Sequence, residues 1–134
     1  MTGLVGLVTL LAVFFYAWTG VAVSQARTKY SIKAPAMTGN ADFERAVRVQ
    51  ANTLEWLPIF IVCLWMFPTT WLGPWLPAAL GLVWIVGRVM YMQGYTAAAD
   101  KRGMGFLVQG IAVALLFIGS LIGVIQSLVT IGIT

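Results

Sequence analysis

The chain contains no histidine, a single cysteine (Cys63) and only four aspartate or glutamate residues among its 134 positions. Without histidine it lacks the commonest general base and the commonest metal and haem ligand. One cysteine excludes an internal disulfide, and too few ligands remain for a structural zinc site, so we expect no metal. The sequence also has no phosphate-binding glycine loop, catalytic triad or nucleic-acid signature, so we expect no nucleic-acid partner.

Charge is scarce as well. Charged residues make up 9% of the chain, whereas a soluble domain has about 25%. Hydrophobic residues make up 60%, and the mean hydropathy is +0.92. A soluble core of this size could not hide so much apolar surface, but lipid can cover it. The net charge of +4 suits anionic lipid headgroups, an anionic small ligand, or both.

Four apolar segments are each long enough to cross a bilayer as a helix, which takes about 20 residues. We therefore predict an all-α integral membrane protein, a four-transmembrane-helix bundle forming one domain over residues 1–134. Pro58 should kink the second span. The first could be a signal peptide ending at Ser24-Gln25-Ala26, but it lacks a basic n-region and its apolar run is too long, so we expect it to be retained. The predicted spans cover about residues 3–26, 43–67, 75–97 and 105–131.

The orientation follows from the basic residues. They cluster at the first and third loops, whereas the second loop and both termini have none. The positive-inside rule then predicts that loops one and three are cytoplasmic and that the termini lie on the opposite side. Trp65, Trp71 and Trp75 would form an aromatic belt at that opposite face. Six of the eight basic residues lie at these loops: Arg27, Lys29, Lys33 and Arg45 at the first, and Lys101 and Arg102 at the third.

Polar residues form a stripe on each of two predicted helices. On the second span, positions 45, 48, 52 and 55 fall within an arc of about 80°. Gln50 points away from this arc. On the third span, Arg88, Tyr91 and Tyr95 repeat the same helical spacing, and Arg102 would join them if the helix continued. The stripe on the second span consists of Arg45, Arg48, Asn52 and Glu55.

Two of these charges lie deep and at equal depth. Glu55 is thirteen residues beyond Asp42, and Arg88 is thirteen before Lys101, so both sit about 20 Å from the same edge. A charge costs about 2.5–3.5 kcal/mol at the centre of a membrane helix, so opposite charges there should pair. We predict a Glu55–Arg88 ion pair. This pair could be purely structural, holding the helices together.

The shallower residues include more cations than the carboxylates can neutralise. A surplus of arginine in a protected groove favours an anionic ligand, because guanidinium groups bind carboxylates with two hydrogen bonds. The alternative is that these side chains extend to lipid phosphates at the interface.

Two strings carry a family resemblance. Residues 43–55, FERAVRVQANTLE, followed by Pro58, resemble the second-helix motif of the MAPEG family (membrane-associated proteins in eicosanoid and glutathione metabolism). Residues 88–95, RVMYMQGY, with Arg102 seven positions on, resemble its third-helix motif. The likeness covers nearly the whole chain and is strongest to the microsomal glutathione transferase and leukotriene synthase branches.

The resemblance implies a homotrimer with glutathione sites between neighbouring subunits, open to the cytoplasm. It implies that Arg102 is catalytic and stabilises the glutathione thiolate. Glutathione would be a co-substrate, and a hydrophobic electrophile or lipid hydroperoxide would arrive from the membrane lipid. Some members have Tyr where this chain has Trp56, so a hydroxyl contact is missing there. The implied glutathione-binding residues are Arg27, Arg48, Gln50, Asn52, Glu55, Tyr91 and Tyr95.

We therefore expect a membrane-bound glutathione transferase, with reduction of lipid hydroperoxides kept open as a further activity. Glu55 could meet the glutathione ammonium instead of Arg88, or both. The alternative function is a non-catalytic lipid-binding partner protein, a role that the family also includes. A small transporter is disfavoured because neither polar stripe extends toward the second loop.

Overall fold

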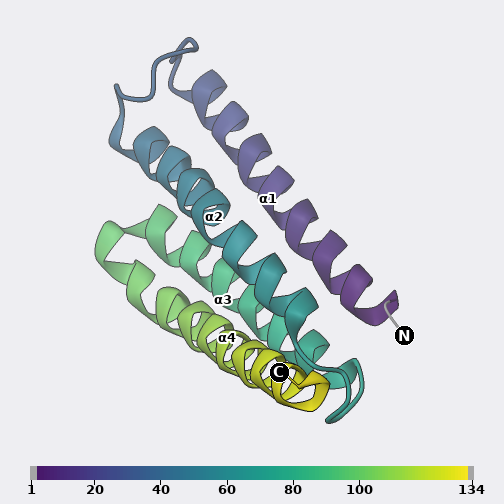
Figure 1. The fold of residues 1–134 in the computed structure, drawn as a ribbon. Helices are drawn as coiled ribbons and strands as arrows, with labels where there is room; N and C mark the ends of the chain where they lie inside the picture. Colours follow the sequence, from purple (N-terminus) through teal and green to yellow (C-terminus); the bar gives the residue numbers. More distant parts are fainter. Residues whose placement is uncertain (1–2, 133–134) are drawn as a thin grey trace.

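The computed structural model describes residues 3–132, which fold as an antiparallel bundle of four long helices (Figure 1). Each of the four is long and apolar enough to cross a membrane. The predicted all-α, four-helix membrane architecture is thus confirmed. The helices are α1 (Gly3–Lys29), α2 (Ala41–Met66), α3 (Trp75–Ala97) and α4 (Gly103–Ile131), and the short 3₁₀ helix η1 (Ala99–Arg102) joins the last two.

The start of α2 is fixed by its sequence. The Asn40 side chain caps the helix, because its Oδ1 accepts hydrogen bonds from the backbone N–H groups of Asp42 (2.9 Å) and Phe43 (3.1 Å). Asp42 and Glu44 add negative charge to the first turn, where the helix dipole favours it. The helix then continues past Pro58 to Met66. This fixed start sets which α2 residues face the other helices.

The bundle is packed most extensively between α3 and α4. Glycines allow this, because a Cβ at Gly105 would overlap the backbone of Tyr91, and one at Gly87 would press on the backbone of Gln109. Farther from the charged end, Phe60 of α2 stacks on Trp84 of α3 with ring centroids 4.0 Å apart. The close α3–α4 contact holds the beginning of α4 against the polar face of α3.

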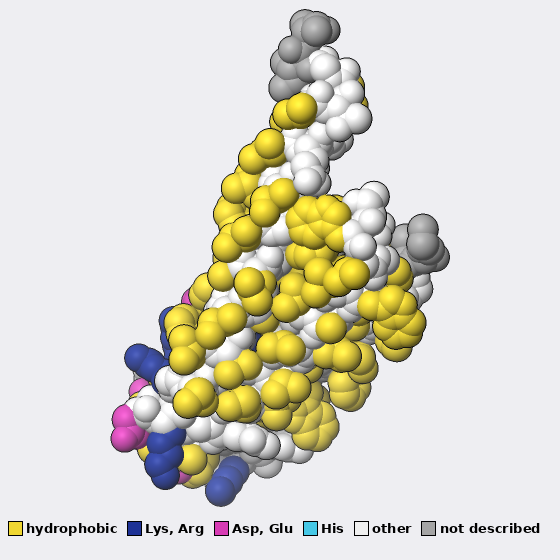
Figure 2. All heavy atoms as spheres, turned by 90° about the horizontal axis from the view of Figure 1, so that it is seen from below, with side chains coloured by type: hydrophobic (Ala, Val, Ile, Leu, Met, Phe, Trp, Pro, Cys, Tyr) yellow, Lys and Arg dark blue, Asp and Glu magenta, His cyan; other side chains and the backbone are white. Residues whose placement is uncertain are grey.

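The charged side chains gather at one end of the bundle, whereas hydrophobic side chains cover the visible shaft (Figure 2). The loop between α1 and α2 lies at the same end as η1, and the loop between α2 and α3 lies at the opposite end (Figure 1). Large apolar side chains such as Leu10 and Phe14 are more than 60% exposed. This surface suits a hydrocarbon environment, and the chain is a multi-pass membrane protein.

Candidate active site

A fully buried arginine forms the floor of the polar region. Arg88, on α3, has 0% exposure. Its Nη1 donates to Asn52 Oδ1 (2.9 Å) and its Nη2 donates to Thr53 Oγ1 (2.6 Å), both on α2. The Thr53 hydroxyl in turn donates to the backbone carbonyl of Val49 (2.7 Å). Because its hydrogen is used there, the Thr53 oxygen faces Arg88 as an acceptor.

The predicted direct ion pair between Glu55 and Arg88 does not occur among the ion pairs of residues 3–132. Glu55 instead accepts from Arg48 Nη1 (3.1 Å) and from Asn52 Nδ2 (3.2 Å). The expectation is corrected to a connection through Asn52, whose amide accepts from Arg88 and donates to Glu55. Arg48 takes the direct pairing because it lies two turns from Glu55 on the same face of α2. One neutral amide thus bridges two opposite charges.

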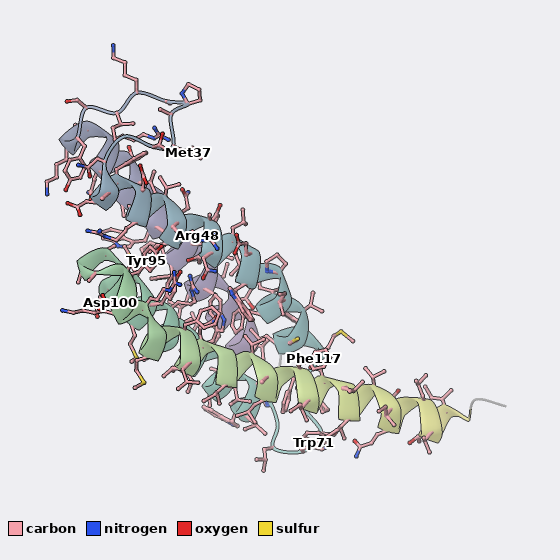
Figure 3. All side chains as sticks on the ribbon, turned by 90° about the vertical axis from the view of Figure 1, so that its left-hand side faces the viewer. Met37, Arg48, Trp71, Tyr95, Asp100 and Phe117 are labelled. Atoms are coloured by element: carbon pink, nitrogen blue, oxygen red, sulfur yellow. The ribbon has the colours of Figure 1, made fainter. Side chains whose placement is uncertain are left out.

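A cavity of about 310 Å³ opens beside this network. It collects residues from α2, from α3 and from the turn into α4, and four of the predicted site residues are among them. Arg48 and Tyr95 lie toward the same end of the bundle as Asp100, far from Trp71 (Figure 3). The residues that line the cavity are Arg48, Asn52, Tyr91, Arg102, Gly103 and Phe106.

Arg102 reaches the cavity from the 3₁₀ turn and not from a continued α3, which ends at Ala97. A glycine makes this turn possible, because a Cβ at Gly94 would overlap the carbonyl oxygen of Lys101. The Arg102 guanidinium then lies 5.3 Å from the centre of the Tyr95 ring. Arg102 also immediately precedes α4, so the positive end of that helix dipole adds to its charge beside the cavity.

Two tyrosines of α3 form a column between two arginines. Tyr95 stacks on Tyr91 at a centroid distance of 5.6 Å, and Tyr91 lies 4.4 Å from the Arg88 guanidinium. Tyr95 does not itself line the cavity but contacts Arg102 and Tyr91, which do. Stacked rings of this kind attract guanidinium groups and restrict their motion. The column therefore restricts the motion of Arg102, which lines the cavity.

Glu55 and Tyr95 do not line the cavity but contact residues that do. Three other residues associated with the site by the resemblance lie farther from it. Arg27 donates to the carbonyl of Ala36 (2.7 Å) and lies over the Phe43 ring at 4.9 Å. The Gln50 amide faces α1, 3.2 Å from the position that a Cβ on Gly20 would take. Trp56 packs edge-on against Phe106 with centroids 5.8 Å apart. Arg27 and Gln50 are therefore not gathered with the others within one protomer.

Three residues that contribute to the site were not singled out from the sequence. Thr53 lies next to Asn52 but off the helical arc, and its hydroxyl could have been noticed as a rare polar group at that depth. Gly103 directly follows Arg102, and this adjacency could have suggested that the first residue of α4 belongs to the site. Phe106 carries no such signal, because it resembles every other apolar residue of the span.

The fold and the site together define a four-helix membrane protein with a polar cavity at its charged end, lined by two arginines. The chain belongs to the MAPEG family, whose family model matches residues 5–122. It is 43% identical to an uncharacterized protein of Synechocystis sp. over 122 residues, which is 91% of this chain and 88% of that protein.

Two named relatives are also similar over most of the chain. Microsomal glutathione S-transferase 2 of Homo sapiens is 40% identical over 119 residues, or 88% of this chain and 80% of the relative. Leukotriene C4 synthase of Bos taurus is 36% identical over 95 residues, or 71% of this chain and 63% of the relative. The family expectation drawn from the two motifs is thus confirmed.

Proposed function

We propose that the protein is a membrane-bound glutathione transferase that joins glutathione to hydrophobic electrophiles. The observation that carries this proposal is the convergence of Arg48, Asn52, Tyr91 and Arg102 on one cavity. The names of the relatives, a glutathione S-transferase and a leukotriene C4 synthase, support the same chemistry.

The cavity suits the charges of glutathione. Glutathione has two carboxylates, one ammonium and a thiol. Arg48 would bind a carboxylate, since guanidinium groups bind carboxylates with two hydrogen bonds. Asn52 and the Tyr91 hydroxyl supply further polar contacts, with Tyr95 behind them. Glu55 is the carboxylate available to the ammonium, because its direct partner is the half-exposed Arg48.

Arg102 activates the thiol electrostatically. A free thiol has a pKa of about 8.5, and a neighbouring cation lowers that pKa by stabilising the thiolate. The thiol proton passes to water at the open end. The thiolate sulfur then attacks the electrophilic carbon, a C–S bond forms, and the leaving group or the opened ring takes the electron pair. In hydroperoxide reduction, the same thiolate would attack a peroxide oxygen, break the O–O bond and release the alkoxide, which takes a proton to become the alcohol. A second glutathione would then reduce the resulting sulfenic acid to glutathione disulfide and water.

The proposed active unit is a homotrimer with its site mouths facing the cytoplasm. The side chains of Arg48 and Glu55 are 50% and 54% exposed in one protomer, although both lie on a membrane-spanning helix. Leaving a charge in lipid costs about 2.5–3.5 kcal/mol at the centre of the membrane, so a neighbouring subunit should cover them. Arg27 and Gln50 lie on the α1 side and would complete a neighbour's site.

The test is the replacement of Arg102. We expect Arg102→Ala to lower conjugation by about 10²-fold or more, because a group that stabilises charge in the reaction is lost. Glutathione binding should stay detectable, since the other site residues remain. Isothermal titration calorimetry measures glutathione binding without depending on the thiolate. Thiolate absorbance in a parallel titration should be lost in the variant, and turnover over a panel of electrophiles and hydroperoxides gives the third readout. Lys101→Ala is the matched control.

Wild-type turnover in the Arg102→Ala variant would contradict the assigned role. A wild-type protein that binds lipid but shows no glutathione-dependent activity on any electrophile would favour a non-catalytic partner protein. The hydroperoxide arm decides whether reduction accompanies conjugation.

A further inference from the structure

A second groove, of about 610 Å³, runs between α1 and α3 and shares no lining residue with the candidate active site. It is almost wholly apolar, and its two polar residues, Gln93 and Thr96, lie at its charged end. Residues 82 to 96 of α3 span fourteen steps, or about 21 Å, which exceeds half of a roughly 30 Å hydrocarbon layer. Its main walls are Phe14, Phe15 and Trp18 of α1, and Ile85, Val89 and Met92 of α3.

A polar pocket of about 520 Å³ adjoins this groove, and Thr96 lines both. The pocket lies where α1 ends and α2 begins. Asp42 is already satisfied there, because it accepts from the Tyr30 hydroxyl (2.8 Å) and pairs with Arg45. Lys29 lies 5.2 Å from the Tyr30 ring and has no carboxylate partner among residues 3–132. The pocket therefore carries two cations against one carboxylate.

We propose that the groove and the pocket together bind one anionic phospholipid, with an acyl chain between α1 and α3 and the phosphate at Lys29. The polar pocket sits at the helix ends, which is the level of lipid headgroups. Basic pockets between transmembrane helices at the Lys/Arg-rich face are known to bind anionic headgroups. An apolar channel that leads from such a pocket matches the shape of one lipid molecule.

The surplus positive charge at Lys29 favours an occupant with an anionic headgroup over an uncharged apolar ligand, which would fill the groove alone. A free soluble anion would leave the apolar groove unexplained. The proposal does not depend on the transferase function, because the ligand, the residues and the readout all differ.

The experiment measures lipid binding to the purified full-length protein by native mass spectrometry. Phosphatidylglycerol and phosphatidylcholine with identical acyl chains are added back after extensive detergent exchange. We expect phosphatidylglycerol to bind more tightly, and Lys29→Gln to weaken it about fivefold while sparing phosphatidylcholine, since one basic residue is lost. Lys33→Gln removes the same charge from the same loop outside the pocket and should change nothing.

The groove is tested with Val89→Trp, because the larger side chain should fill the groove and weaken the binding of both lipids. Val86→Trp is the matched control, because Val86 is 55% exposed on α3 and does not line the groove. Equal binding of the two lipids, or wild-type binding by Lys29→Gln, would overturn the proposal. Displacement of the lipid by millimolar inorganic phosphate would show that the pocket is a site for free anions, and would also overturn the proposal. Unchanged lipid binding with fewer copies per complex in Val89→Trp would identify an interface between copies instead.

Discussion

Asn52 lies between the opposite charges of Arg88 and Glu55 and forms a hydrogen bond with each. Its carbonyl oxygen accepts from Arg88 and its amide nitrogen donates to Glu55. A direct pair with Arg88 would have drawn Glu55 toward the buried interior, whereas its pair with Arg48 lies at the surface of the protomer. With the amide between them, the buried guanidinium keeps a partner, and the carboxylate remains at the surface of the protomer. Arg88 therefore orients the Asn52 amide, and through it Glu55, while being fully buried itself.

Replacing Asn52 should lower the stability of the protein more than replacing Arg88, its hydrogen-bond partner. Asn52→Leu leaves a buried guanidinium with one neutral partner and should destabilise the protein by about 3 kcal/mol or more. Arg88→Met leaves only neutral acceptors unpaired, at about 1–3 kcal/mol. Thermal unfolding in detergent should therefore rank Asn52→Leu as the less stable variant.

The double variant provides the control for this ranking. Asn52→Leu combined with Arg88→Met removes the buried charge together with its lost partner, so it should melt above Asn52→Leu alone. Additive losses in the double variant would show that the two side chains act independently.

At the level of the helices, glycines decide where the site residues lie. Gly105 lets α4 approach the backbone of Tyr91, and Gly94 lets the chain turn back so that Arg102 reaches Tyr95. No side-chain chemistry marks these positions in the sequence. Their effect depends on how closely two helices approach, which is a property of the fold.

Gly105→Ala should therefore push α4 away from α3 and displace Arg102 from the cavity. We expect a lower melting temperature together with weaker glutathione binding, measured by thermal unfolding and by the thiolate titration. Gly110→Ala is the matched control on the same helix, because nothing lies within 4 Å of its added Cβ. Since alanine favours the helix over glycine by about 1 kcal/mol, this control should be as stable as the wild type or more so.

The helices and the polar stripes could be predicted from the sequence because both follow from periodicity and apolar length. The hydrogen-bond and ion-pair partners of the stripe residues could not be predicted in this way. Spacing placed Glu55 and Arg88 at one depth, but rotamers and the adjacent Asn52 determine which atoms meet. The spacing predicts Arg102 on a continued α3. In the structure α3 ends at Ala97, and the turn that Gly94 permits brings Arg102 next to Tyr95 instead. Phe106 was undetectable because a cavity wall and a lipid-facing residue look alike in sequence.

At the scale of the whole molecule, the half-exposed charges of Arg48 and Glu55 support the proposal that neighbouring subunits complete the site. If the proposed trimer shares its sites, a variant defective in one wall should complement a variant defective in the other. Arg48→Ala and Gln50→Ala each remove one wall. Co-expression and co-purification should restore about a quarter of the wild-type activity, since random assembly matches two intact walls at about one site in four.

Each variant expressed alone is the control for this complementation and should have little activity. Purified variants mixed after assembly should also stay inactive unless subunits exchange. Co-expressed variants that give only the average of the two single variants would place the whole site within one protomer.

The loop between α2 and α3, residues 67–74, contains no charged residue. In the proposed orientation, with loops one and three on the cytoplasmic side, that loop is the segment that must traverse the hydrocarbon completely when these two helices enter a bilayer as a hairpin. Crossing therefore carries no ionised side chain through the barrier, while Arg48, Glu55 and Arg88 travel only part of the way. The distribution of charge that builds the site thus also lowers the energetic cost of membrane insertion during biogenesis.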